Sequence, residues 1–272
     1  MKELGTRVFS GLIYASLFIL SLFSEHTIIA LFFIFGLICL AEFNKLIHQK
    51  GIASYIIFAI LYLGFAYWQL IIKSMNGFDE AIQILHVLTI FVLLFLIKDL
   101  FSGKMSLVIT KRYINTTFYI SSAFIFIILI ANYYDEFNPN ILLGSFILVW
   151  INDSFAYLIG KNFGKQKLFP SISPKKTVEG FLGGLFFACI GSFFIAKYTN
   201  TLSFNNWLIL AIIVSVFGTL GDLVESKYKR QADVKDSGII MPGHGGLLDR
   251  LDSIIFAAPF IYLFLRILKY VS

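Results

Sequence analysis

Residues 27–47 read TIIALFFIFGLICLAEFNKLI, and no charged side chain occurs between Thr27 and Ala41. An α-helix needs about 20 predominantly apolar residues to cross the hydrocarbon core of a bilayer. Stretches of similar character recur along the chain, at residues 7–23, 52–73, 84–101, 114–132, 141–160, 178–197, 207–225 and 252–270. The sequence therefore predicts an all-α fold, a polytopic integral membrane helix bundle of about nine transmembrane helices.

The composition excludes a water-soluble globular domain. Of the 272 residues, 58% are hydrophobic and 14% are charged, whereas soluble domains carry about 25% charged residues. The formal net charge of +6 is explained by the basic loops of a membrane protein and by anionic lipid head groups. We therefore expect the lipid bilayer as a partner and no nucleic acid.

Lysine and arginine residues predict the orientation, because cytoplasmic loops of membrane proteins retain them. Most of the 22 basic residues fall in the N-terminal segment and in the second, fourth, sixth and eighth loops. The loops on the opposite side contain only Lys73 and Lys197. This asymmetry predicts a cytoplasmic N-terminus, and the compact chain favours a bacterial plasma membrane.

Acidic residues divide the chain into two halves. In residues 1–140 they lie at loops or helix ends, which is typical of an N-terminal transmembrane scaffold. In residues 141–272 they enter or adjoin the apolar spans, at Asp153, Glu179, Asp222, Glu225, Asp249 and Asp252. A carboxylate at the centre of a membrane helix costs about 2.5–3.5 kcal/mol, so such residues usually serve a function. We therefore expect residues 141–272 to form a C-terminal transmembrane catalytic region.

The spacing of the acids indicates a cation site. Asp222 and Glu225 are three residues apart, as are Asp249 and Asp252, so each pair lies on one face of a helix. Like charges so placed repel one another unless a cation or a proton lies between them. Mg²⁺ suits carboxylate and phosphate oxygens. Calcium or a protonated acid pair would fit the acids alone equally well.

Two polar loops accompany these acids. Pro174 predicts the first turn of a helix with Ser173 as its N-cap, and the exposed N–H groups beside Lys175 and Lys176 would bind an anion. A capped helix with ordinary cytoplasmic lysines explains this loop equally well. In the other polar loop, residues 235–246, glycines around His244 allow a close approach of the backbone to a ligand. A flexible loop would explain these glycines, but not the acids at 249 and 252 that adjoin a membrane helix.

Residues 226–252 contain a long polar motif, Ser226-x-x-Lys229-Arg230-x4-Lys235-Asp236-x-Gly238-x3-Pro242-x-His244-Gly245-Gly246-x-x-Asp249-Arg250-x-Asp252. Two further motifs lie upstream, Asp153-Ser154-x-Ala156-Tyr157 and Ser173-Pro174-Lys175-Lys176-Thr177-x-Glu179-Gly180. With these motifs the chain resembles the phosphatidate cytidylyltransferase family over residues 150–255.

The resemblance implies a reaction in which CTP and phosphatidic acid give CDP-diacylglycerol and pyrophosphate at the cytoplasmic face. It implies Mg²⁺ as cofactor, is compatible with a second cation, and suggests a homodimer. Asp222 and Asp249 would hold the metal, with Glu225 or Asp252 as alternative ligands. The implied catalytic residues are Asp222, Asp249, Lys229, Arg230, His244 and Arg250. The implied substrate-binding residues are Asp153, Ser173, Lys175, Lys176, Thr177, Lys235, Gly245 and Gly246.

Other classes of membrane protein share some of these features. A lipid-alcohol kinase that uses CTP would need similar phosphate-binding groups, but its acceptor would be a free alcohol. An ion-coupled transporter would also carry acids within its spans. Transporters often show internal repeats with broken helices in both halves, whereas the polar residues of this chain concentrate in one half. These two classes are the alternatives to a cytidylyltransferase.

Overall fold

The computed structural model describes residues 2–72, 77–102, 111–134, 136–243 and 245–271. Its elements in chain order are α1 (Lys2–Ser21), α2 (Glu25–Leu46), α3 (Ala53–Tyr62), the π-helical segment η1 (Leu63–Ile72), α4 (Phe78–Phe101), α6 (Arg112–Asn115), the π-helical segment η2 (Thr116–Ser121), α7 (Ser122–Ile130), α8 (Asn140–Phe163), β1 (Lys167–Phe169), β2 (Ser173–Thr177), α9 (Val178–Thr199), α10 (Phe204–Gln231) and α11 (Leu248–Val271).

The predicted all-α membrane bundle is confirmed. In the described part of the chain, seven helical segments are long and apolar enough to cross a membrane, and they coincide with seven of the predicted spans. Shorter apolar helices, Ser10–Ser21 and Ala53–Tyr67, lie within the first and third predicted spans. The count of nine crossings and the cytoplasmic N-terminus remain predictions.

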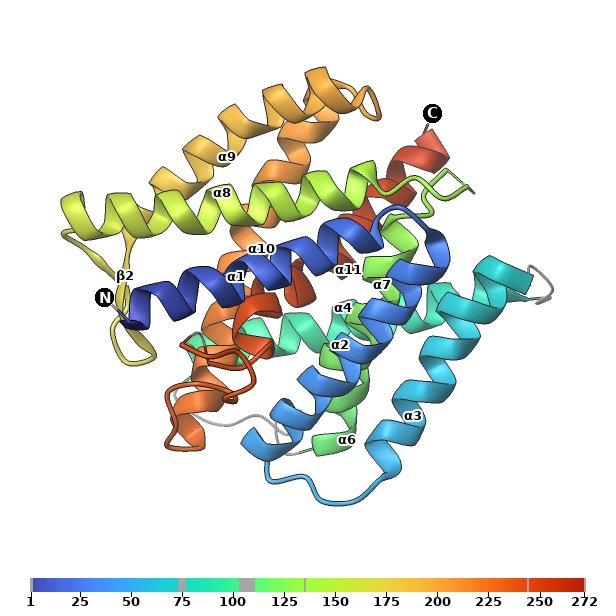
Figure 1. The fold of residues 1–272 in the computed structure, drawn as a ribbon, viewed down its shortest axis with the longest axis horizontal. Coiled ribbons are helices and arrows are strands. Elements are labelled where there is room, and N and C mark those ends of the chain that lie inside the picture. The colour runs from blue at the N-terminus through green and yellow to red at the C-terminus, as the bar shows by residue number, and fades with distance from the viewer. Residues whose placement is uncertain (1, 73–76, 103–110, 135, 244, 272) are drawn as a thin grey trace.

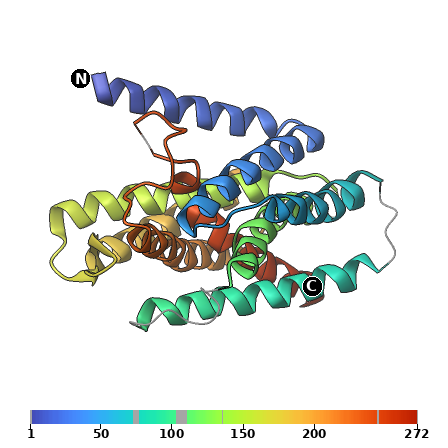
Figure 2. The ribbon, with the colours of Figure 1, turned by 90° about the horizontal axis from the view of Figure 1, so that it is seen from below.

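The helices form layers around a buried centre. Figure 1 shows α8 and α9 side by side along one edge, with the two termini at opposite sides of the bundle. Figure 2 shows α1 and α4 on opposite outer faces, with the other helices between them. Every residue of α7 is buried, as expected for a helix that is hydrophobic all round and surrounded by protein.

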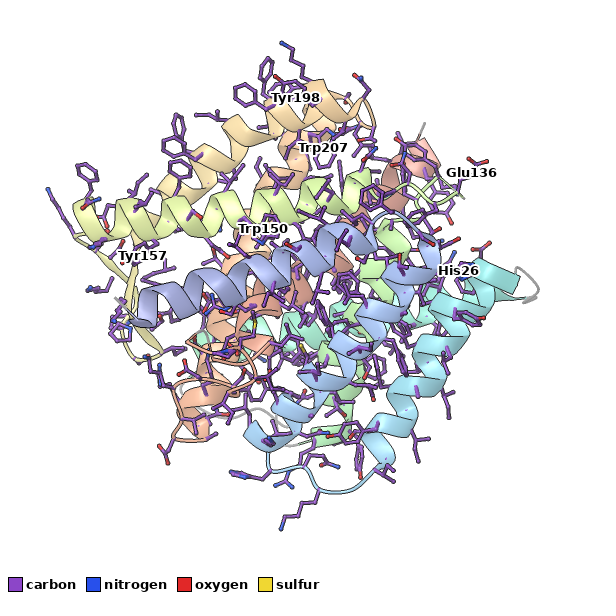
Figure 3. The ribbon with its side chains drawn as sticks, viewed as in Figure 1. His26, Glu136, Trp150, Tyr157, Tyr198 and Trp207 are labelled. Atoms are coloured by element: carbon purple, nitrogen blue, oxygen red, sulfur yellow. The ribbon has the colours of Figure 1, made fainter. Side chains whose placement is uncertain are left out.

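Aromatic side chains mark the outer ends of the α8–α9 layer. Figure 3 shows Tyr157 near the end of α8 that adjoins β2, and Tyr198 near the opposite end of α9. The two side chains are 65% and 76% exposed. Amphipathic rings at the two ends of membrane helices are typical of lipid–water interfaces.

Small residues let α9 approach α8 closely. A Cβ added at Gly180 would lie 2.7 Å from the carbonyl oxygen of Ala156, and one added at Gly184 would lie 2.6 Å from that of Asn152. Lipid supplies no hydrophobic drive between helices, so membrane helices associate through such close backbone contacts. The contact fixes α8 against α9 and therefore fixes the β1–β2 segment that joins them.

Replacing Gly184 with alanine is expected to lower the free energy of unfolding by about 1–3 kcal/mol, the usual cost of overpacking. The matched control is Gly64→Ala, because an added Cβ at Gly64 meets no described atom within 4 Å outside its own helix. Chemical denaturation in detergent micelles measures both variants. Equal stability of the two would contradict the tight α8–α9 contact.

The predicted helix start at Ser173 is wrong. Residues Ser173–Thr177 form β2, which pairs antiparallel with β1 through Phe169 opposite Ser173 and Lys167 opposite Thr177. Helix α9 begins at Val178, with the Thr177 hydroxyl accepting a hydrogen bond from the Gly180 amide at 3.1 Å. Threonine is a good N-cap, and a proline without an N–H is tolerated in so short a strand. Lys175 and Lys176 therefore lie on a strand.

Several helices extend further than the hydropathy predicts, and the extensions of α10 and α11 contain candidate site residues. Helix α10 continues to Gln231, so Lys227, Lys229 and Arg230 are helical and not part of a loop. Helix α11 begins at Leu248 and includes Asp249 and Arg250. The polar residues near the C-terminal end of α10 remain helical, because many of them are buried against protein and not exposed to lipid.

Candidate active site

Three carboxylates converge where α10 crosses α11. Asp222 and Glu225 on α10 and Asp252 on α11 each present an oxygen, and these atoms lie within 4.8 Å of one another. Glu225 is 0% exposed and Asp252 is 8% exposed. The two helices approach closely because Gly221 has no side chain: an added Cβ would lie 2.8 Å from the Asp252 carbonyl oxygen. We refer to Asp222, Glu225 and Asp252 as the carboxylate cluster.

Two lysines neutralise part of this charge. Lys229 Nζ lies 2.5 Å from Glu225 Oε2 and 2.6 Å from Asp249 Oδ1. Its side chain is only 10% exposed, so the ion pairs are poorly screened by water. Lys176 reaches the cluster from β2, with Nζ 2.6 Å from Asp222 Oδ2. The hairpin that replaces the predicted helix start thus delivers a basic side chain to the carboxylate cluster.

Asp249 makes different contacts from the three clustered acids. Its Oδ2 accepts hydrogen bonds from Ser237 N at 2.9 Å, Ser237 Oγ at 2.9 Å and Gly246 N at 2.7 Å. Its Oδ1 pairs with Lys229. Both oxygens are therefore engaged, and the carboxylate joins Lys229 of α10 to Ser237 and Gly246 in the segment before α11.

That segment, residues 232–247, borders an open pocket of about 600 Å³. The pocket is lined by Lys235, Asp236, Gly238, Ile239, Met241, Gly243, Gly245 and Arg250. The Met241 amide donates to the Gly245 carbonyl at 2.9 Å and closes the loop on itself. Gly245 has φ +89°, and an added Cβ would lie 2.7 Å from Asp249 Oδ2, so a side chain here would be strained. The charged side chains that line the pocket are those of Lys235, Asp236 and Arg250.

Comparison with known proteins identifies the family. The sequence profile described as the Cytidylyltransferase family matches residues 5–268. The chain belongs to this family. It is 34% identical over 276 residues to the phosphatidate cytidylyltransferase of Bacillus subtilis (strain 168), covering 98% of this chain and 99% of the relative. It is 50% identical over 126 residues to the phosphatidate cytidylyltransferase of Staphylococcus aureus (strain COL), covering 46% of this chain and 48% of the relative.

The structure of this cytidylyltransferase brings many of the predicted site residues together. The carboxylate cluster, Lys176, Lys229 and Asp249 form one connected set of ion pairs and close contacts. Asp153 on α8 interacts electrostatically with Asp222 and Lys176, and its Oδ1 accepts from Asn152 Nδ2 at 3.2 Å. The acids of this set come from three different helices.

Other predicted residues lie beside this set. Arg230 donates from Nη1 to the Val234 carbonyl at 3.0 Å and from Nε to the Ile172 carbonyl at 3.4 Å, so it links α10 to the β1–β2 turn. Lys175 is exposed on β2, and Thr177 caps α9. Ser173 opens β2, and Gly246 donates its amide to Asp249. His244, which the family resemblance implies to be catalytic, lies outside the described residues.

The structure adds two polar residues that the sequence predictions did not include. Glu42 on α2 is 2% exposed and lies against the segment before α11, where its carboxylate accepts the amides of Leu247 and Leu248. Ser237 lies between Glu42 and Asp249. Glu42 stands in a predicted span, where the rule on intramembrane acids would have selected it. The sequence predictions placed Glu42 at a helix end and therefore did not select it as a candidate site residue.

Proposed function

We propose that this cytidylyltransferase transfers the cytidylyl group of CTP to phosphatidic acid, giving CDP-diacylglycerol and pyrophosphate at the cytoplasmic face of the membrane. The observation that carries this proposal is the carboxylate cluster with its paired lysines, beside a pocket that Lys235, Asp236 and Arg250 line, at one end of a membrane bundle. The relative from Bacillus subtilis that this chain matches along 98% of its length bears the name of this activity.

The residues of the cluster fit a divalent cation. Neither oxygen of Glu225 has an aligned hydrogen-bond donor among the described residues, and Lys229 Nζ is its paired charge. The cluster and Asp249 carry four formal negative charges, and Lys176 and Lys229 carry two positive charges, which leaves two negative charges. Asp222, Glu225 and Asp252 would hold Mg²⁺, which takes carboxylate and phosphate oxygens. A bound Mg²⁺ neutralises phosphate charge and orients the triphosphate.

The reaction is a displacement at the α-phosphorus of CTP. An oxygen of the lipid phosphate forms the new bond to this phosphorus, and the bond to the oxygen that bridges to the β-phosphorus breaks. Pyrophosphate leaves with that electron pair. The lipid phosphate is already anionic, so the step needs no strong general base. Positioning and charge neutralisation contribute most of the rate in such transfers.

The basic residues of this chain supply that neutralisation. We assign Lys235 and Arg250, which line the pocket, and Lys175 and Lys176 on β2 to the phosphates of CTP and the lipid. Cationic clamps aimed at the transferred group are typical of phosphoryl-transfer sites. Lys229 is enclosed by Glu225 and Asp249, so we assign it to holding these acids in place.

The position of the site in the bundle supports a cytoplasmic active site. The hairpin of β1 and β2 and the 232–247 segment both follow helices that run toward the N-terminal side of the bundle (Figure 1). The basic loops predict that this side faces the cytoplasm. CTP would then reach the pocket from the cytoplasm, and phosphatidic acid would reach it from the bilayer.

Labelled CTP tests the proposal directly. The enzyme in nanodiscs is incubated with Mg²⁺ and phosphatidic acid, and transfer of label into the lipid phase is measured. We expect transfer from α-labelled CTP and none from γ-labelled CTP, because the α-phosphorus is the one retained in the product. Diacylglycerol and polyprenol serve as alternative acceptors. Label from γ-labelled CTP on either alcohol would instead establish a lipid-alcohol kinase, and absence of transfer from folded protein would favour the transporter.

A further inference from the structure

Glu42 is a buried carboxylate of α2 in the half of the chain to which the predictions assigned no chemistry. It lies four residues before the end of the helix and is 2% exposed. Burying a carboxylate is costly unless hydrogen bonds or a paired charge compensate it. The hydrogen-bond partners of Glu42 therefore indicate its role.

Those partners lie about 200 residues further along the chain, where α11 begins. Glu42 Oε1 accepts from Leu247 N at 3.1 Å, and Oε2 accepts from Leu248 N at 2.8 Å. These amides belong to the start of a helix, where N–H groups lack partners within the helix and attract negative charge. One side chain from α2 thus fixes the position of the first turn of α11.

The adjoining loop is shaped around the same carboxylate. A Cβ added at Gly246 would lie 2.6 Å from Glu42 Oε2, and a Cβ added at Gly238 would also collide with this side chain. Ser237 Oγ lies 2.9 Å from Asp249 Oδ2 and 3.4 Å from Glu42 Oε2, so its single proton favours Asp249. Glu42 and Asp249 therefore hold the segment beside the pocket at two places, at Ser237 and at Gly246 and Leu247.

We propose that Glu42 is a positioning residue for the transfer reaction, acting through the first turn of α11 and the 237–246 loop. Asp249 follows directly after the two amides that Glu42 binds, and Asp252 of the carboxylate cluster lies one turn later. A displacement of this turn would move both acids relative to Asp222 and Lys229 on α10. Displacements of about 1 Å in an active site can lower the rate about 100-fold. The inference rests on the proposed function.

The test compares Glu42→Ala and Glu42→Gln with the wild-type enzyme. We expect Glu42→Ala to lower kcat about 10- to 100-fold. We expect it to accelerate hydrogen–deuterium exchange at the amides of Leu247 and Leu248. Glu42→Gln should fall between alanine and the wild type in both measurements, because its amide oxygen still accepts one of the two N–H groups. If the alanine variant does not fold, the glutamine variant carries the test.

The matched control is Asn44→Ala on the same helix. Asn44 is also buried, but its Nδ2 donates to Ser54 Oγ at 2.9 Å, away from the loop. This variant should lose stability without changing kcat per folded molecule or exchange at residues 247 and 248. Unchanged exchange at these residues in Glu42→Gln, or a kcat loss no greater than the loss of folded protein, would overturn the inference. If the wild type transfers no label, the proposed function fails, and the exchange comparison still decides whether Glu42 holds the loop.

Discussion

Replacing Lys229 with methionine is expected to lower the free energy of unfolding by about 3–5 kcal/mol, the usual cost of removing one partner from a buried ion pair. Lys229 Nζ contacts Glu225 at 2.5 Å and Asp249 at 2.6 Å, and its side chain is 10% exposed. Without the ammonium group, two buried carboxylates would repel each other. We also expect turnover to fall below detection, because both acids lose the group that fixes them.

Denaturation in mixed micelles measures the stability, and the labelled-CTP assay measures turnover. Lys227→Met is the matched control, because Lys227 lies on the same helix but donates to the carbonyl of Asp99 on α4. Addition of Glu225→Gln to Lys229→Met should recover part of the lost stability by removing one buried charge, but it should not recover turnover. A Lys229→Met protein as stable as Lys227→Met would refute the buried-pair assignment.

Hydropathy was sufficient to predict the fold class. Bilayer thickness imposes a minimum length on every spanning helix, and each backbone group in lipid must be paired within its own segment. These constraints act on local sequence, so residues such as 27–41 predict a helix without any knowledge of its neighbours. The division into residues 1–140 and 141–272 stays a prediction, and the contact between Glu42 and the start of α11 crosses it.

Local sequence patterns did not predict which polar residues pack against other parts of the protein. Lys229 is polar, so hydropathy places it in a loop, yet Glu225 and Asp249 compensate its charge and α10 continues past it. Ser173 resembles an N-cap, but its strand is stabilised by pairing with Phe169, four residues earlier in the chain. For Lys229, one of the two partners, Asp249 on α11, is a tertiary contact that the pattern within α10 does not contain. For Ser173, the partner is close in sequence, but the N-cap pattern does not test whether the chain turns back on itself to form a strand pair.

Asn substitutions at Asp222 and Asp249 should separate binding of a cation from positioning of the loop. The family resemblance implies that Asp222 and Asp249 hold the metal, with Glu225 or Asp252 as alternative ligands. In the structure, Asp222 lies in the carboxylate cluster, and its two oxygens contact the side chains of Lys176 and Ser226. Asp249 Oδ2 instead accepts the backbone amides of Ser237 and Gly246 in the loop, and Asp249 Oδ1 pairs with Lys229. We therefore propose that Asp222 is a metal ligand and that Asp249 organises the loop.

We expect Asp222→Asn to weaken binding of Mn²⁺, a substitute with similar oxygen ligands, by more than about 100-fold, since even groups that merely support a metal ligand contribute 10- to 100-fold. Asp249→Asn should abolish turnover in a folded protein, as the family resemblance also predicts, but leave Mn²⁺ binding unchanged and accelerate exchange at the Ser237 and Gly246 amides. Electron paramagnetic resonance of free Mn²⁺ measures binding even in inactive variants.

Glu225→Gln and Asp252→Asn should behave like Asp222→Asn, because the three acids form one cluster. Loss of Mn²⁺ binding in Asp249→Asn, with normal binding in Asp252→Asn, would instead establish Asp222 and Asp249 as the ligands, because it would show that the loop contacts of Asp249 give way when the cation binds.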